Sequence, residues 1–437
     1  MSTNSIRISN MTGCPGCDLL LEKKTISEGK RVRCPRCGTV IRKSVENSLQ
    51  KSLAVSLAGL ILFFPAMFMD IMTFTVAGLQ GSGNMFDSVT VLMSEGYLFV
   101  AFMVLLVSIV FPFLKLGLLF TSSLSAISGR VSPATRKSFR LYNHLQEWGM
   151  VEVYLLGILV SIIKMYSMAD ISYDTGFFCF VGLVILAVAS STVVDEDSFW
   201  DAMGEARPEP QGESVISTAL LAREETALSA GLVSCEECGK LSRVLTVSVD
   251  EVMRCRRCLT LLHSRKPGSI SRTWALLITS AVLFLPANIL PMMRVNFMGA
   301  IDDSTILDGI MYFFHDGDYF IGSIILIASV LVPLFKIVGI LIILLSIHFH
   351  QVNWLEQKTM MFRFIEFIGR WSFLDIFVIG LLASLVRFGT LSTIEASPAI
   401  VYFTAVVVST MFAALALDPR IIWDAAAHRK NTRVSNV

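Results

Sequence analysis

Two apolar stretches of this sequence carry the same pattern of charged, aromatic and small residues. The stretch from Trp371 to Arg387 is long and apolar enough to cross a membrane, and it has an acid at Asp375 near its start. The stretch from Trp148 to Lys164 has its tryptophan, acid, glycine, serine and cation in the same places, 223 residues earlier. Charged side chains inside apolar helices are costly and usually face the interior of a bundle. The pattern therefore predicts two related membrane units in one chain.

This duplication extends over nearly the whole chain. Cysteines, prolines, an aspartate and a lysine of the first half recur 221 residues later, and tryptophans further along recur after 223. Each copy has a cysteine motif followed by four apolar runs of transmembrane length. The expected spans lie near residues 52–72, 97–124, 150–168, 176–194, 273–293, 319–347, 372–390 and 398–417. We predict an all-α integral membrane protein, a tandem repeat of two four-helix transmembrane modules, each preceded by a small zinc-ribbon domain with four cysteines.

Composition and loop charge agree with insertion into a membrane. The chain is 54% hydrophobic and only 16% charged, well below the quarter that is usual in soluble proteins. Lysine and arginine gather in segments 1–52, 125–149, 195–272, 348–370 and the tail from residue 418. The other four loops carry Arg294 alone. Because basic loops stay in the cytoplasm, both termini and both cysteine domains are predicted to be cytoplasmic. The net charge of +1 gives no indication of a nucleic-acid partner, and none is expected.

The domain boundaries follow from the two copies and from a linker between them that is rich in proline and acid. We expect zinc ribbons at 1–48 and 233–268, membrane modules at 49–202 and 269–426, a linker at 203–232 and a tail at 427–437. Residues 73–81 and 294–299, in the first external loop of each module, are expected to form short strands.

Eight of the nine cysteines form four C-x-x-C pairs, and sixteen residues separate the two pairs of each copy. The predicted metal ligands are Cys14, Cys17, Cys34, Cys37, Cys235, Cys238, Cys255 and Cys258. Four thiolates at this spacing suit the tetrahedral geometry of Zn²⁺ and leave no open position, so a structural site is favoured over a catalytic one. Iron in the same cage would make an electron carrier, so a membrane redox protein remains an alternative.

Each cysteine domain is too small for a core of its own, so the metal would supply its folding energy. Arginines crowd the second C-x-x-C pair of each domain: Arg31, Arg33, Arg36, Arg254, Arg256 and Arg257. Two interpretations stay open for these arginines, a contact with anionic lipid headgroups and a solvated basic face.

Two lysines lie deep in the second span of each module. Lys115 and Lys336 each follow a proline by three residues, and each lies roughly 14–16 Å from the cytoplasmic end of its helix. Glu152 and Asp375 begin the next span and are the nearest candidate partners. One hypothesis is a protonatable polar switch, with Lys336 and Asp375 as its main residues and Lys115 and Glu152 as their counterparts. The other hypothesis is a buried ion pair that only fixes the helix register.

Four further residues are candidates for a substrate route. Lys164 and Arg387 end the third span on the external side, where they either snorkel to the interface or hold a lipid phosphate. Asn288 and Pro291 interrupt the outer end of the fifth span, and interrupted helices are typical of transporter binding sites. The second module is therefore predicted to be the half that handles substrate.

Several of these motifs resemble one family. They are Leu285-Pro-Ala-Asn-Ile-Leu-Pro291, Pro333 with Lys336, the run from Gly369 to Val378 and the run from Asp418 to Asp424. The sequence resembles the paraquat-inducible protein A family of bacterial inner-membrane proteins over almost its whole length. The first copy departs from the pattern at 195–201, which lacks a Pro-Arg pair.

The resemblance implies a role in lipid movement between the inner and outer membranes of Gram-negative bacteria. Members of the family look like the inner-membrane partner of a periplasmic tunnel built from MCE-domain proteins. Their membrane modules are likened to tetraspanin-type four-helix units with a β-rich first external loop. We therefore predict a non-enzymatic membrane protein that passes phospholipid or another hydrophobic molecule between the inner membrane and an MCE tunnel, supporting envelope integrity. A passive anchor for the tunnel is a further alternative.

Overall fold

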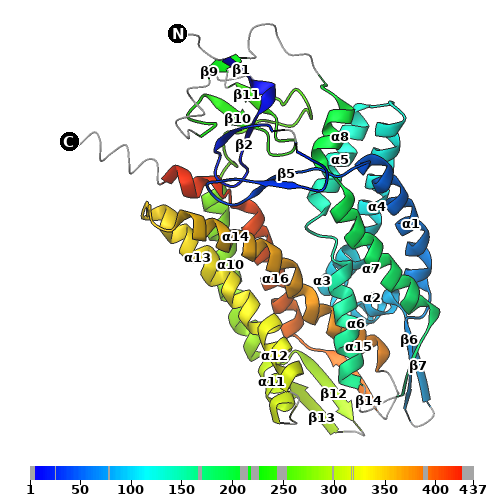
Figure 1. The fold of residues 1–437 in the computed structure, drawn as a ribbon. Coiled ribbons are helices and arrows are strands. Elements are labelled where there is room, and N and C mark those ends of the chain that lie inside the picture. The colour runs from blue at the N-terminus through cyan, green and yellow to red at the C-terminus, as the bar shows by residue number, and fades with distance from the viewer. Residues whose placement is uncertain are drawn as a thin grey trace.

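The computed structural model describes residues 5–24, 26–76, 79–165, 170–206, 215–217, 226–243, 253–297, 300–315, 317, 319–386 and 392–425. The described part is a helical bundle with the two cysteine domains at one end and two small sheets at the other (Figure 1). We call these the ribbon end and the sheet end. Most of the expected linker, all of the expected tail and Arg387 lie outside the described residues.

The two repeats contain matching helices. The first repeat has α1 (Ser48–Phe68), α2 (Met85–Ser94), α3 (Leu98–Val104), η2 (Leu105–Val110), α4 (Phe111–Ile127), α5 (Pro133–Leu145), α6 (Val151–Met165), α7 (Thr175–Val193) and α8 (Glu196–Met203). The second has α10 (Ser269–Ile289), α11 (Ile306–His315), α12 (Tyr319–Ile325), η3 (Leu326–Leu331), α13 (Val332–His348), α14 (Leu355–Gly369), η4 (Arg370–Phe373), α15 (Leu374–Leu385) and α16 (Ala399–Ala416). Within each repeat, the first span packs against the last span and against the second.

Seven runs of the described residues are long and apolar enough to cross a membrane, so the chain is a multi-pass membrane protein. The third span differs from expectation in both repeats, because α6 has 15 residues and α15 has 12. A helix of 12 residues is about 18 Å long, less than the roughly 30 Å hydrocarbon core. The run that contains α15 begins at Leu355 and is the most buried of the seven. The third spans pack on each other at the centre of the molecule, as Figure 1 shows for α6 and α15.

A wider helical turn precedes the proline of each second span. Residues Leu105–Val110 and Leu326–Leu331 form π-helical turns, and Pro112 and Pro333 then lie in the first turn of the α-helix that follows. Proline has no N–H to donate, and a π turn lets the preceding carbonyls bond further along the chain. Both repeats therefore position their intramembrane lysine just after the same backbone irregularity.

Each repeat carries a three-stranded antiparallel sheet at the sheet end, so the fold is mostly but not entirely helical. The sheets have the order β7-β6-β8 and β13-β12-β14. Their strands are β6 (Met72–Val76), β7 (Leu79–Gly83), β8 (Asp170–Tyr173), β12 (Met293–Phe297), β13 (Ala300–Ser304) and β14 (Ser392–Ala396). The first two strands of each sheet lie where the sequence predicts them. The third strand comes from the short loop after the third span, which the sequence analysis left without structure.

The cysteine domains are small antiparallel hairpins. The first contains β2 (Met11–Gly13), β3 (Leu20–Glu22), β4 (Arg31–Arg33) and β5 (Val40–Lys43), and the second contains β10 (Leu232–Ser234), β11 (Leu241–Arg243) and a bridge between Arg254 and Leu261. A short turn η1 (Ile8–Asn10) precedes β2, and β1 (Ser5–Arg7) pairs with β9 (Val215–Ser217). The two domains share a small apolar cluster, so they pack against each other.

An approximate two-fold axis relates the repeats along the whole molecule. Tyr154 and Phe377, equivalent residues on α6 and α15, have ring centroids 5.1 Å apart. Near the ribbon end, the equivalent residues Glu147 and Arg370 form an ion pair of 3.8 Å. In the ribbon domains, Gly13 faces its equivalent Ser234, whose Cβ would lie 3.3 Å from a Cβ placed on the glycine. A residue touches its own equivalent only near a two-fold axis, so the axis passes through all three contacts.

Candidate metal centres and intramembrane charges

Each cysteine domain brings its four thiols into one buried cluster. The four sulfur atoms of each cluster lie within 4.8 Å of one another. The shortest separations are 3.5 Å for Cys14–Cys37 and for Cys235–Cys258. These separations exceed the length of a disulfide bond, about 2.05 Å. They lie close to the roughly 3.8 Å expected between thiolates that surround a tetrahedral Zn²⁺ at 2.3 Å. The donor set therefore fits a tetrahedral thiolate metal ion in both domains.

The four C-x-x-C turns share one backbone geometry. In each turn the residue after the second cysteine donates its N–H to the carbonyl of the first, at 2.8–3.0 Å. That residue has a positive φ in all four turns: Asp18, Gly38, Gly239 and Leu259 lie between 59° and 70°. Glycine adopts this conformation without strain, whereas aspartate and leucine are strained in it. Local strain of this kind persists where the surrounding structure fixes the turn, and a bound metal ion would do so.

The C-x-x-C turns of the first ribbon dock on the membrane module of the second repeat. Its four cysteines belong to a buried cluster that includes Phe362 and Trp423. Arg363 of α14 donates to the carbonyl of Cys37 at 3.2 Å. The guanidinium of Arg36 lies 4.5 Å from the ring centre of Trp423. The expected order of one ribbon with its own module therefore holds along the chain but not in space.

The second ribbon docks on the first repeat in the equivalent way. Its cysteines share a buried cluster with aromatic residues of α5 and α8. Arg136 and Arg140 of α5 donate to the carbonyl of Arg257 and to the hydroxyl of Thr260, both at 2.8 Å. Arg257 also forms an ion pair with Asp201. The two ribbons thus cross over, and each caps the module of the other repeat.

An ionic network joins the first ribbon to the segment after α16. Arg265 bonds Asp18 at 2.9 Å and Asp424 at 2.6 Å. Asp418, which is 1% exposed, accepts two hydrogen bonds from the side chain of Arg420 at 2.9 and 2.8 Å. Burial opposes ionisation of Asp418, but the hydrogen bonds and charge of Arg420 outweigh it, and the pKa of this carboxyl lies below its usual value. Both ends of this network are folded against the second repeat.

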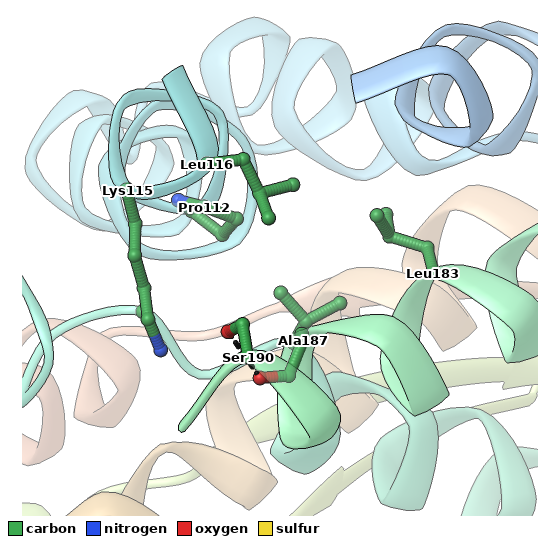
Figure 2. A pocket seen from close by; sticks show the side chains of 8 residues that line it. Pro112, Lys115, Leu116, Leu183, Ala187 and Ser190 are labelled. Atoms are coloured by element: carbon green, nitrogen blue, oxygen red, sulfur yellow. Dashed lines mark hydrogen bonds between the residues drawn. The ribbon is translucent and has the colours of Figure 1, made fainter. Parts of the chain in front are cut away.

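The intramembrane lysine of the first repeat borders a small cavity. Lys115, 9% exposed, lies on α4 and faces α7 across the cavity, as Figure 2 shows with Ser190 on the opposite wall. Ser190 donates to the carbonyl of Ala187 at 2.7 Å rather than to the lysine. Glu152 is the carboxylate whose charge acts most strongly on Lys115. The structure thus brings Lys115 and Glu152 into electrostatic range, as the sequence analysis expects.

The equivalent lysine of the second repeat has a different environment. Lys336 is 1% exposed, and its Nζ has no hydrogen-bond partner among the described residues, Asp375 included. A cavity between the repeats is lined by this lysine, Thr410, Glu366 and Glu147 of the first repeat. Neither glutamate acts measurably on Lys336 through its charge, and we therefore regard both as rim residues. The cavity has room for about one water molecule.

The remaining predicted residues take the following places. Glu152 and Asp375 are half-buried in the first turns of α6 and α15. Asn288 is half-buried on α10, and its amide donates to the carbonyl of Phe284 at 2.8 Å. Pro291 lies two residues beyond the end of α10 and accepts from the N–H of Ala399 at 3.2 Å. The side chain of Lys164 and the whole of Arg387 lie outside the described residues.

The ends of α1 and α10 show how the proline pattern acts. Each helix has 21 residues and an internal proline, and each ends at the equivalent position, Phe68 and Ile289. Pro291 therefore follows a helix end that the first repeat reaches without a second proline. The pattern does not by itself distinguish the two modules.

The sequence analysis missed the arginines that anchor the ribbons. Arg140 and Arg363 are equivalent residues of α5 and α14, and Arg36 and Arg257 are equivalent residues of the two ribbons. The signal was their shared offset of 223 and 221 residues, which the repeat comparison contained. Arg36 and Arg257 contact protein groups rather than standing as a wholly solvated face.

Comparison with known proteins agrees over the same regions. The family model described as Paraquat-inducible protein A matches residues 49–204 and 270–427. Intermembrane transport protein PqiA of Escherichia coli strain K12 is 31% identical over 412 residues, 94% of this chain and 95% of that protein. Lipophilic envelope-spanning tunnel protein A of the same strain is 30% identical over 414 residues, 94% and 91% of the two chains. A probable intermembrane transport protein of Haemophilus influenzae is 26% identical over 413 residues, 94% and 95% of the two chains. No solved structure matches the chain.

Proposed function

Because the chain belongs to the paraquat-inducible protein A family, we propose that it is the inner-membrane component of a lipid transport system. It passes phospholipid or another hydrophobic molecule between the inner membrane and a periplasmic MCE tunnel and so supports envelope integrity. Three relatives carry the words intermembrane transport or envelope-spanning tunnel in their names, which supports this class of function. The chain acts as a transporter rather than as an enzyme.

The observation that carries the proposal is the buried amine of Lys336, which has no hydrogen-bond partner within the described part of the chain. Taking a charged amine out of water costs several kcal/mol unless a partner compensates. Intramembrane ionisable groups are retained at that cost mainly where ions, protons or substrates move. Lys336 and Asp375 form the polar switch, and Lys115 and Glu152 are its counterparts in the first repeat. The contrast between the two lysines supports substrate handling by the second module.

The rest of the machine follows the same symmetry. The chain has two four-helix modules of tetraspanin type, eight spans in all, with both termini and both ribbons in the cytoplasm. Zinc occupies the two four-cysteine sites as a structural ion, held by all eight paired cysteines. Asn288 and Pro291 border the substrate route at the sheet end, together with Lys164 and Arg387. The sheet end faces the periplasm and the MCE tunnel.

The transport proposal is tested in a bacterial host that lacks its own relatives of this chain. Lys336→Met and Asp375→Asn are compared with the matched variants Lys115→Met and Glu152→Gln. We expect the second-module variants to lose at least tenfold in survival against a detergent, while the first-module variants keep most of the protection. Membrane level and co-purification of the tunnel protein serve as controls for folding and assembly.

Full protection by Asp375→Asn and Lys336→Met, with normal assembly, would reduce the chain to a passive anchor. The metal is tested separately by elemental analysis of the purified protein. Two zinc ions per colourless chain are expected. Two iron ions with visible absorbance would instead favour a membrane redox protein.

A further inference from the structure

Each ribbon is anchored on the helix that leads into the third span of the other repeat. The run Leu355–Leu385 joins α14 through η4 to α15, so α14 ends where the helix with Asp375 begins. In the first repeat, α5 ends five residues before α6, which carries Glu152. We propose that each metal-bound ribbon positions the third span of the opposite repeat, with Arg363 and Arg140 as the positioning residues. Metal at one site then controls the intramembrane acid of the other half.

Two contacts connect the first metal site to α14. Arg363 donates directly to the carbonyl of Cys37, the last predicted metal ligand of that ribbon. Arg36, which lies between Cys34 and Cys37, stacks on Trp423. The indole N–H of Trp423 in turn donates to the hydroxyl of Thr359 on α14, at 3.1 Å. Both contacts start within the same C-x-x-C turn and end on the same helix.

The second metal site reaches α5 through the equivalent residues. Arg140 donates to Thr260, whose hydroxyl lies 3.3 Å from the sulfur of Cys258. The ring of Trp200, the equivalent of Trp423, lies 5.3 Å edge-on from the ring of Phe139 on α5. The same connection therefore exists in both directions. A contact kept by two repeats whose lysines have diverged in environment points to a shared role in positioning these helices.

The metal is the part of each connection that can be removed. A four-cysteine hairpin of this size has little core of its own, so loss of the ion unfolds the turn that presents the carbonyl or the hydroxyl. The arginine would then lose its acceptor, and the cytoplasmic end of the third span would lose its anchor. Because the anchors cross, the effect appears in the repeat that does not contain the emptied site.

Amide hydrogen exchange on the full-length protein in nanodiscs tests this crossing. Cys34→Ser empties the first site, and the equivalent substitution Cys255→Ser empties the second. We expect Cys34→Ser to speed exchange at least tenfold in 355–369 and to leave 133–145 near the wild-type rate. Cys255→Ser should do the reverse. An equal effect on both helices, an effect on the helix of the same repeat, or no effect on either would overturn the proposal.

A second pair of variants keeps the test decisive if an emptied ribbon unfolds the whole protein. Arg363→Met and Arg140→Met leave every cysteine in place. Each should keep two metal ions per chain by elemental analysis while speeding exchange in its own helix alone, and Arg363→Lys should restore part of the protection. Unchanged exchange in both methionine variants would show that the arginines do not position the helices. These readouts do not involve transport, so their failure is separate from a failure of the proposed function.

Discussion

Replacing Lys336 by methionine should make the protein more stable. The side chain is 1% exposed and its amine has no hydrogen-bond partner among the described residues. Removing buried charge in favour of a well-packed apolar group of similar volume is neutral or stabilising by about 1–4 kcal/mol. Methionine keeps most of the length of lysine and tolerates irregular packing. The gain therefore comes from the desolvation cost that the amine no longer imposes.

The expected shift is measurable by thermal unfolding in detergent. For a module of roughly 150 residues, about 1–4 kcal/mol corresponds to roughly 2–15 °C in midpoint temperature. Tryptophan fluorescence reports the transition at a fixed scan rate, since unfolding of such proteins is often irreversible. Lys115→Met is the matched control, and it should give a smaller gain or a loss, because it leaves the nearby Glu152 without its cation.

A lower midpoint for Lys336→Met than for the wild type would refute this reasoning. It would mean that the amine has a stabilising partner in the membrane. A stability gain together with lost envelope protection would identify a residue kept for function at the expense of stability.

Three further results are expected. Gly176→Ala should lower the midpoint strongly, because the added Cβ would lie 2.4 Å from the carbonyl oxygen of residue 70, whereas Gly117→Ala meets nothing within 4 Å and should be mild. Asp418→Asn should cost about 3–5 kcal/mol at pH 7. Because the folded pKa lies below its usual value, the gap from wild type should narrow as the pH falls below about 3.9, and a gap that widens in acid contradicts this. A double-mutant cycle on Tyr154 and Phe377, truncated to leucine, should give about 0.5–1.5 kcal/mol of coupling, and additive effects would argue against their contact.

Much of the helical layout follows from the sequence because membrane spans impose a strong length requirement. The starts and ends of α1, α7, α10 and α16 differ from the expected spans by only a few residues, since each span faces lipid along its length. The third spans defied the same reasoning. The helices α6 and α15 are shielded by the rest of the bundle, so their length is set by packing between repeats instead of by the bilayer.

The metal ligands could be predicted from spacing alone, whereas their position relative to the membrane modules could not. Four thiolates need only a local fold to meet, and two C-x-x-C turns sixteen residues apart provide it. Docking of a ribbon on its own module or on the other module leaves the same periodicity in the sequence. The decision rests on contacts such as Arg363 with Cys37, between residues more than three hundred positions apart.

Partners of the intramembrane charges were also beyond the reach of the sequence. Lys336 and Asp375 are separated by one loop and occupy matching depths, but the geometry of α13 and α15 keeps the amine out of hydrogen-bond distance. Lys115 and Glu152 have the same spacing in the first copy and do influence each other. Identical patterns therefore produced two environments.

The contact of Tyr154 with Phe377 on the approximate axis points to the history of the chain. A half-length ancestor would have assembled as a homodimer, each subunit lending its metal hairpin to its twin, and gene fusion then joined the two. Once fused, the halves were free to specialise, so that a lysine kept near its carboxylate in one half came to lie apart from it in the other. Asymmetry of that kind is unavailable to a homodimer encoded by a single gene copy, and a one-way carrier requires it.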